Sequence, residues 1–195
     1  MAEAGDYVPE TRAWQQMREM SARLLKERTG SGVDAWNRRI RKERPGNEAD
    51  LRAWLTGQGV IGYAQSLLVM ERFGYPDFMV ASADELIRGQ YADRPRLRPI
   101  YDRIIEAAAS LGEVTVQARK TYVSLVSRKR TFARVQASAK DRVDVALRLE
   151  GAKPGGRLKP SRIQETMRVQ VGLASPKDLD SEVLELLRRA YEENR

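Results

Sequence analysis

The sequence predicts an α+β protein, with a small all-α unit over residues 1–92 and an α-β(5)-α unit over residues 93–195. Apolar residues in the first part recur at intervals of three and four, the period of an amphipathic helix. Between residues 114 and 173 the period changes to two, which is typical of strands with one buried face. The segment 89–99 between them is polar and contains two prolines, which favours a domain boundary there.

Capping residues and glycines divide the first part into helices. Asn47 is a favourable N-cap, and Ser82 with Glu85 has the spacing of a capping box. The helix that follows Asn47 and ends at Gly57 is expected to be the third, and a fourth covers residues 61–73. Together they have the outline of a helix-turn-helix, but the fourth offers few basic or amide side chains to read a groove. We therefore favour simple packing of two helices, with the three tryptophans in the core. The apolar stripes behind these helices contain Trp14, Met17, Leu24 and Leu25; Val33, Trp36 and Ile40; Leu51, Trp54 and Leu55; and Tyr63, Ala64, Leu67 and Leu68.

The second part is predicted to begin and end with a helix. The first of these covers residues 97–111 and is closed by Gly112, and the last begins at Ser175-Pro176, because proline is tolerated in the first helical turn. Each helix has one apolar face, so we expect both to cover the same side of an antiparallel meander. The five expected strands cover residues 114–116, 121–126, 131–137, 143–149 and 167–173.

Positive charge is concentrated in one stretch of the chain. The net charge of +8 belongs entirely to the second half, and residues 114–170 hold 14 Lys+Arg against 4 Asp+Glu. Such an asymmetry indicates an anionic partner. The alternative is a solvated face that keeps the protein soluble.

Strand alternation places many of these cations on one side of the sheet. If the apolar residues face the helices, Arg142, Arg148, Arg168 and Gln170 face outward. Together with arginines, the rings of Tyr122 and Phe132 would form a surface for stacking and phosphate pairing. The alternative is that both rings belong to the core and that the arginines only solubilise the sheet. The candidate nucleic-acid-binding residues are Tyr122, Arg128, Lys129, Arg130, Phe132, Arg134, Arg148, Lys153, Arg157, Lys159, Arg168 and Gln170.

A glycine-rich segment at residues 151–162 joins the last two expected strands. Gly155 and Gly156, with the nearby cations, would suit a phosphate, although the Gly-Lys-Ser/Thr ending of a P-loop is absent. The plainer alternative is a mobile connection.

Several classes of function are excluded or disfavoured. The chain contains no histidine and no cysteine, which excludes imidazole and thiolate catalysis and the usual zinc and iron–sulfur sites. Asp144, Glu150 and Lys153 approach a nuclease motif, but their spacing is wrong and acidic residues are few. We therefore expect no catalytic residues, no metal and no cofactor. The N-terminus lacks a signal peptide and no segment is apolar enough to span a membrane, so we expect a cytoplasmic protein.

Two parts of the sequence resemble known families. Residues 113–126, followed by residues 130–136, the strand over residues 143–149 and the closing helix, resemble the bacterial domain-of-unknown-function family 5655. An earlier pattern resembles the short helical family 4287, which is often found beside it; it consists of Thr29-Gly30, Trp36, Leu51, Trp54-Leu55, Gly59 and Gly62-Tyr63-Ala64. These resemblances imply an architecture rather than an activity. The α-β(5)-α order is also similar to the YjbR-like and frataxin-like sandwiches, some relatives of which have been suggested to bind DNA.

The sequence thus predicts a non-enzymatic protein whose basic sheet binds nucleic acid, DNA rather than RNA, mainly through phosphates and with little sequence specificity. The alternative is a protein-interaction module, in which the helical half docks a partner and the sheet meets an acidic protein.

Overall fold

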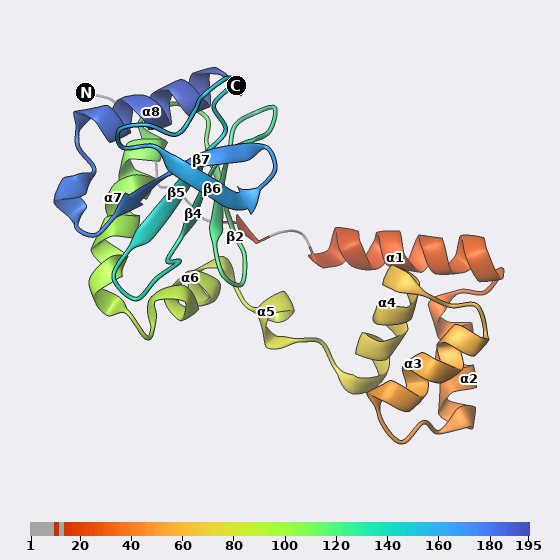
Figure 1. The fold of residues 1–195 in the computed structure, drawn as a ribbon. Helices are drawn as coiled ribbons and strands as arrows, with labels where there is room; N and C mark the ends of the chain where they lie inside the picture. The colour runs from red at the N-terminus through yellow and green to blue at the C-terminus, as the bar shows by residue number, and fades with distance from the viewer. Residues whose placement is uncertain (1–9, 12–13) are drawn as a thin grey trace. The chain divides into compact units, whose positions relative to one another are not determined.

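The structure is a computed structural model that describes residues 10–11 and 14–195 (Figure 1). It contains two compact units: a helical unit, Ala13–Ala81, and a sheet unit, Ser82–Arg195, to which the short strand β1 (Glu10–Thr11) also belongs. The division therefore lies between residues 81 and 82 and not between 92 and 93. The reason is α6 (Ala83–Tyr91), which contacts the sheet: the Gln90 amide donates to the carbonyls of Arg119 and Tyr122, at 2.7 and 3.3 Å.

The helical unit is built from short helices around an aliphatic and tryptophan core. Trp36 is buried and meets the partly buried Trp54 edge-on, with ring centroids 6.0 Å apart; the side chain of Trp14 lies outside the described residues. Asn47 caps α3, since its Oδ1 accepts the Asp50 N–H at 2.9 Å, as its position predicts. The helices are α1 (Trp14–Thr29), α2 (Val33–Glu43), α3 (Glu48–Gly57), α4 (Gly62–Phe73) and α5 (Asp77–Val80).

The α3–α4 pair packs as a helical hairpin. Gln65 is the amide that a recognition helix would direct outward. Its Nε2 instead donates to the carbonyl of Val60 at 3.0 Å and to the Thr56 hydroxyl at 2.9 Å. This amide therefore ties α4 to the preceding turn, which agrees with the packing interpretation.

The sheet unit has an α+β fold, as predicted. Its strands form one open sheet in the order β1-β2-β3-β4-β5-β7-β6, in which β2 to β7 are antiparallel and β1 adds in parallel at the edge. The strands are β2 (Thr115–Ala118), β3 (Val123–Val126), β4 (Thr131–Gln136), β5 (Val143–Leu147), β6 (Lys159–Gln164) and β7 (Met167–Leu173).

The five expected strands form the predicted antiparallel meander, as β2, β3, β4, β5 and β7, and the sheet gains two strands that were not predicted, β6 beside β7 and β1 beside β2. β6 occupies the end of the predicted glycine-rich connection, and β7 lies between β5 and β6. β6 escaped the sequence pattern because it contains Pro160 and is an exposed edge strand, with no apolar alternation to mark it. β1 has only two residues and pairs with a strand more than a hundred positions away.

Two helices cover the apolar face of the sheet. α7 (Arg98–Ala109) and α8 (Ser181–Glu192) contact each other, and α8 packs on β4 and β5 (Figure 1). Ser175-Pro176 does not begin α8: it opens a 3-10 turn, Pro176–Asp178, and α8 is capped by Asp180, whose Oδ1 accepts the Val183 N–H at 3.0 Å. The remaining 3-10 turn is Pro95–Leu97. The buried side chains of this face include Val123, Leu125, Val135, Val145, Leu147, Val169, Val171 and Leu173.

Across the described residues, the helices are too short or too polar to cross a membrane.

Candidate nucleic-acid interface

The side of the sheet that faces away from α7 and α8 is the candidate interface, and we call it the polar face. One cross-strand row defines it, because residues paired across neighbouring strands share a face. The register joins each member of this row to the next, from β2 to β6. The row consists of Gln117, Ser124, Arg134, Ala146, Gln170 and Lys159.

Two further cations, Arg148 and Arg168, lie on one side of this row, because β5 and β7 run antiparallel past the pair of Ala146 and Gln170. Arg168 is exposed and alternates with the buried Met167 and Val169. Arg148 follows β5 directly, and its Nε donates to the carbonyl of Thr131 at 2.9 Å. Burial, and after it the neighbouring Arg130 cation, lower the pKa of Arg148. Gln170 and Arg168 thus lie on the polar face as alternation predicts, whereas Arg148 lies at one end of the sheet, in a pocket with Glu193 and Asn194 after α8.

Phe132 is the exception, and the expectation of an outward ring at this position was wrong. Leu125 pairs with Ala133 and Val126 pairs with Thr131, so a β-bulge leaves Phe132 without a partner on β3. The extra residue turns its side chain toward the helices. There it is fully buried, with its ring centroid 5.5 Å from that of Tyr191 on α8.

Tyr122 remains on the polar face, where Arg134 stacks on it. The guanidinium carbon of Arg134 lies 3.4 Å from the Tyr122 ring centroid, and Nη2 donates to Gln136 Oε1 at 3.2 Å. Burial lowers the pKa of Arg134, but a guanidinium keeps its charge at neutral pH. The stack therefore holds a flat cation in a fixed position near the middle of the sheet.

A pocket of about 380 Å³ opens on the polar face beside β7. The Nε of Arg142 donates to Oδ1 of the buried Asp144 at 2.7 Å, and Ser138 donates to Oδ2 of the same carboxylate. A Cβ at Gly172 would lie 2.6 Å from Cδ of Arg142, so glycine makes room for the arginine. Asp144 is the one carboxylate at the paired positions of this face from β2 to β6, and Arg142 neutralises it. The lining consists of Arg142, Asp144, Gly156, Arg157, Lys159, Gln170 and Gly172.

The glycine-rich connection forms a tight turn rather than a phosphate cradle. Gly155 and Leu158 exchange backbone hydrogen bonds of 2.9 and 3.0 Å, which uses the Gly155 N–H, and Gly156 adopts the left-handed conformation at φ 56°. Arg157 is drawn away from any anion, because its Nη1 pairs with Asp180 at 2.5 Å. Lys153 remains exposed in the connection.

The β3–β4 turn carries three of the predicted cations. Arg128 pairs with Glu113 at 3.0 Å, and Lys129 is exposed. Arg130 lines a second, smaller pocket of about 230 Å³ with Arg148 and Glu193. These cations therefore stand at one end of the polar face and not in its central row.

The described residues contain no cluster of three or more metal-ligating side chains. The nuclease-like Asp144 is occupied by Arg142 and Ser138, and the backbone N–H of Glu150 donates to Glu193 Oε2 at 2.8 Å.

A comparison with protein-family models finds a match to the sheet unit. The model of a domain of unknown function, DUF5655, matches residues 83–194, which is more than half of the chain. The chain belongs to the DUF5655 family. The DUF5655 match begins with α6 and ends after α8, so it follows the observed boundary of the sheet unit and contains the whole polar face from β2 to β6. No curated protein and no solved structure matches the chain significantly.

Proposed function

We propose that this DUF5655 protein binds nucleic acid on the polar face of its sheet, mainly through phosphates. The observation that supports it is the cross-strand register, which gathers Arg134 and Lys159 in one row with Gln170, beside Arg168. These cations have no carboxylate partner within salt-bridge distance among the described residues, unlike Arg142 and Arg157. Lys159 and Arg168 are exposed, so their charge is available to an anion, whereas Arg134 is half-buried against Tyr122.

The composition of this surface favours the phosphate backbone over base edges. Phosphate contacts position a protein on nucleic acid without carrying sequence information. The polar face offers one ring, Tyr122, and it is already covered on one side by Arg134. We therefore expect little discrimination between sequences, with DNA as the first ligand to test.

Salt dependence is the sharpest test of this proposal. If Arg134, Arg148, Lys159 and Arg168 neutralise about four phosphates, log affinity should fall with log salt at a slope near −3.6 on duplex DNA. The measurement is a fluorescence anisotropy titration of labelled mixed-sequence DNA, repeated with RNA and at several salt concentrations. Absence of binding at low salt would refute the proposal.

A matched pair of variants separates local charge from net charge. Replacing Lys159→Gln and Arg168→Gln together should reduce the magnitude of the slope by about 1.8, roughly 0.9 for each lost contact. The control, Arg103→Gln with Arg188→Gln, removes the same net charge from α7 and α8, which cover the opposite face. If the control weakens binding as much as the test pair, the polar face is not the interface.

A further inference from the structure

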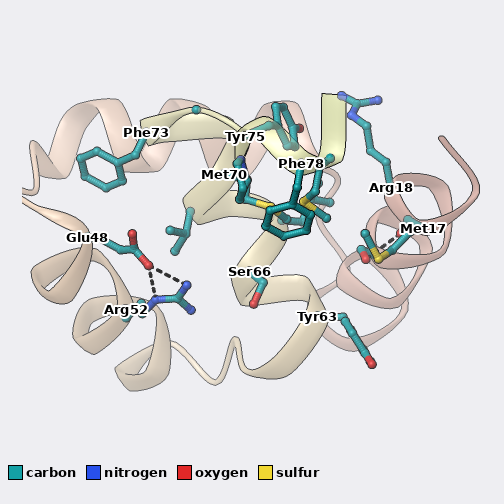
Figure 2. A pocket seen from close by; sticks show the side chains of 16 residues that line it. Met17, Arg18, Glu48, Arg52, Tyr63, Ser66, Met70, Phe73, Tyr75 and Phe78 are labelled. Carbon is teal, nitrogen blue, oxygen red and sulfur yellow. Dashed lines mark hydrogen bonds and ion pairs between the residues drawn. The ribbon is translucent and has the colours of Figure 1, made fainter. Parts of the chain in front are cut away.

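The helical unit contains a pocket of about 560 Å³ that plays no part in the proposed function (Figure 2). Its floor is one side of α4, where Tyr63, Ser66, Leu67, Met70 and Phe73 follow each other at helical spacing. Residues of α1 and α3 line it as well, and α5 and the segment before it contribute the rest. We call this concavity the α4 groove. Its other lining residues include Met17, Arg18, Arg52, Tyr75, Phe78 and Met79.

The lining of the α4 groove is apolar and adaptable. Three methionines contribute to it, and methionine is common on surfaces that bind apolar partners. Tyr63, Phe73 and Phe78 are 64%, 41% and 40% exposed. Of the large hydrophobic side chains exposed among the described residues, these three line the groove, and the others except Leu184 lie elsewhere in the helical unit. Clustered exposed apolar groups of this kind mark interaction sites.

The charged groups of the α4 groove are already balanced. Arg18 pairs with Glu71 at 3.0 Å, and the Tyr75 hydroxyl donates to the same carboxylate at 2.5 Å. Arg52 pairs with Glu48 at 2.8 Å (Figure 2). An uncharged surface can therefore cover the groove without leaving a buried charge unpaired. Because both arginines are neutralised by carboxylates, these two pairs do not favour a polyanionic ligand.

We propose that the α4 groove binds the apolar face of an amphipathic helix from a partner protein. From Tyr63 to Phe73 the floor rises over ten residues, roughly 15 Å, which matches about three turns of a second helix. A small ligand would normally be enclosed over most of its surface, whereas the rings of this groove remain half-exposed. Helix-in-groove recognition uses apolar anchors at helical spacing, and the uncharged floor on α4 and the three methionines of the lining complement such anchors.

The test uses synthetic peptides and the full chain. The probe is a dye-labelled helix of roughly 16 residues, long enough to be stable in isolation, built from Leu, Ala, Glu and Lys with leucines spaced three and four apart. A permuted peptide of the same composition lacks the apolar face. Titrations are followed by anisotropy at roughly 0.5 M salt, which screens attraction to the cations of the sheet unit. We expect the permuted peptide to bind at least about tenfold more weakly.

Variants of the groove test whether the peptide binds there. Met70→Glu should lower the affinity for the amphipathic peptide by about tenfold or more, because the bound peptide would bury an unpaired carboxylate. Tyr63→Ser changes an exposed ring, so it should leave folding intact and still weaken binding several-fold. The control is Leu184→Ser, which removes the exposed hydrophobic side chain of the sheet unit and should have no effect. Equal binding of both peptides, no binding, or equal effects of Tyr63→Ser and Leu184→Ser would overturn the proposal. The proposal would also be overturned if the protein sedimented as a dimer and Tyr63→Ser made it monomeric, because the groove would then be occupied by a second copy of this chain.

Discussion

Gly112 follows α7 in a position that only glycine fits. Its φ is 134°, and a Cβ there would lie 2.6 Å from the hydroxyl oxygen of Tyr191 on α8. Gly112→Ala should therefore lower the free energy of unfolding by about 1–3 kcal/mol, through both backbone strain and the clash. Urea denaturation followed by circular dichroism measures the change.

Gly89 provides the matched control in the same unit. It lies inside α6, and nothing stands within 4 Å of the Cβ that alanine would add. Gly89→Ala should raise stability by about 0.5–1 kcal/mol, because alanine is the better helix former. If both substitutions moved stability in the same direction, the close approach of Tyr191 would not be the reason for glycine at position 112.

Single residues also show where sequence patterns succeed and where they fail. The alternation around Arg134 predicted its outward position because the neighbouring Ala133 and Val135 are both apolar and buried. The capping box of Ser82 and Glu85 was predictable because it depends on four consecutive residues. Asp180 was missed as the cap of α8 because Ser175-Pro176 offers an equally good local signal five residues earlier.

At the scale of the element, the bulge in β4 decides the role of Phe132. A bulge changes the face of a side chain without changing the alternation that a sequence shows, so it could not be predicted from β4 alone. The same limit applies to β6 and β1, whose pairing depends on distant strands. The polar face was thus predictable strand by strand, whereas its edges and its bulge were not.

The bulge leads to a prediction that separates core from interface. Phe132→Ala should lower the free energy of unfolding by about 3–5 kcal/mol, because it leaves a cavity beside Tyr191. The protein that remains folded should bind nucleic acid as the wild type does. Where Phe132→Ala leaves too little folded protein, Phe132→Leu serves for the same titration. A selective loss of binding in a stable variant would return Phe132 to the interface.

At the scale of the whole molecule, charge distinguishes the two units. Residues 114–170, in the sheet unit, carry the excess of cations, while the α4 groove balances Arg18 and Arg52 within its own ion pairs. The location of the basic segment was predictable by counting residues. The groove was not predicted, because the same helical spacing of apolar residues describes a core face and an exposed one.

This division predicts one binding activity that depends strongly on salt and one that does not. Raising salt from 50 to 200 mM should weaken DNA binding by about a hundredfold at a slope near −3.6. The affinity for the amphipathic peptide should change by no more than about twofold, because apolar burial does not depend on counterion release.

Substitutions in the two units should act on different ligands. The neutral variant Tyr63→Ser should weaken peptide binding and leave DNA affinity unchanged, while Lys159→Gln with Arg168→Gln should do the reverse. Because these residues share no partner, the variant with all three substitutions should show the product of the separate changes in each ligand's affinity, to within about twofold. Both titrations on each variant test this, and a substitution in one unit that alters the other ligand's affinity would show that the two surfaces are not separate sites.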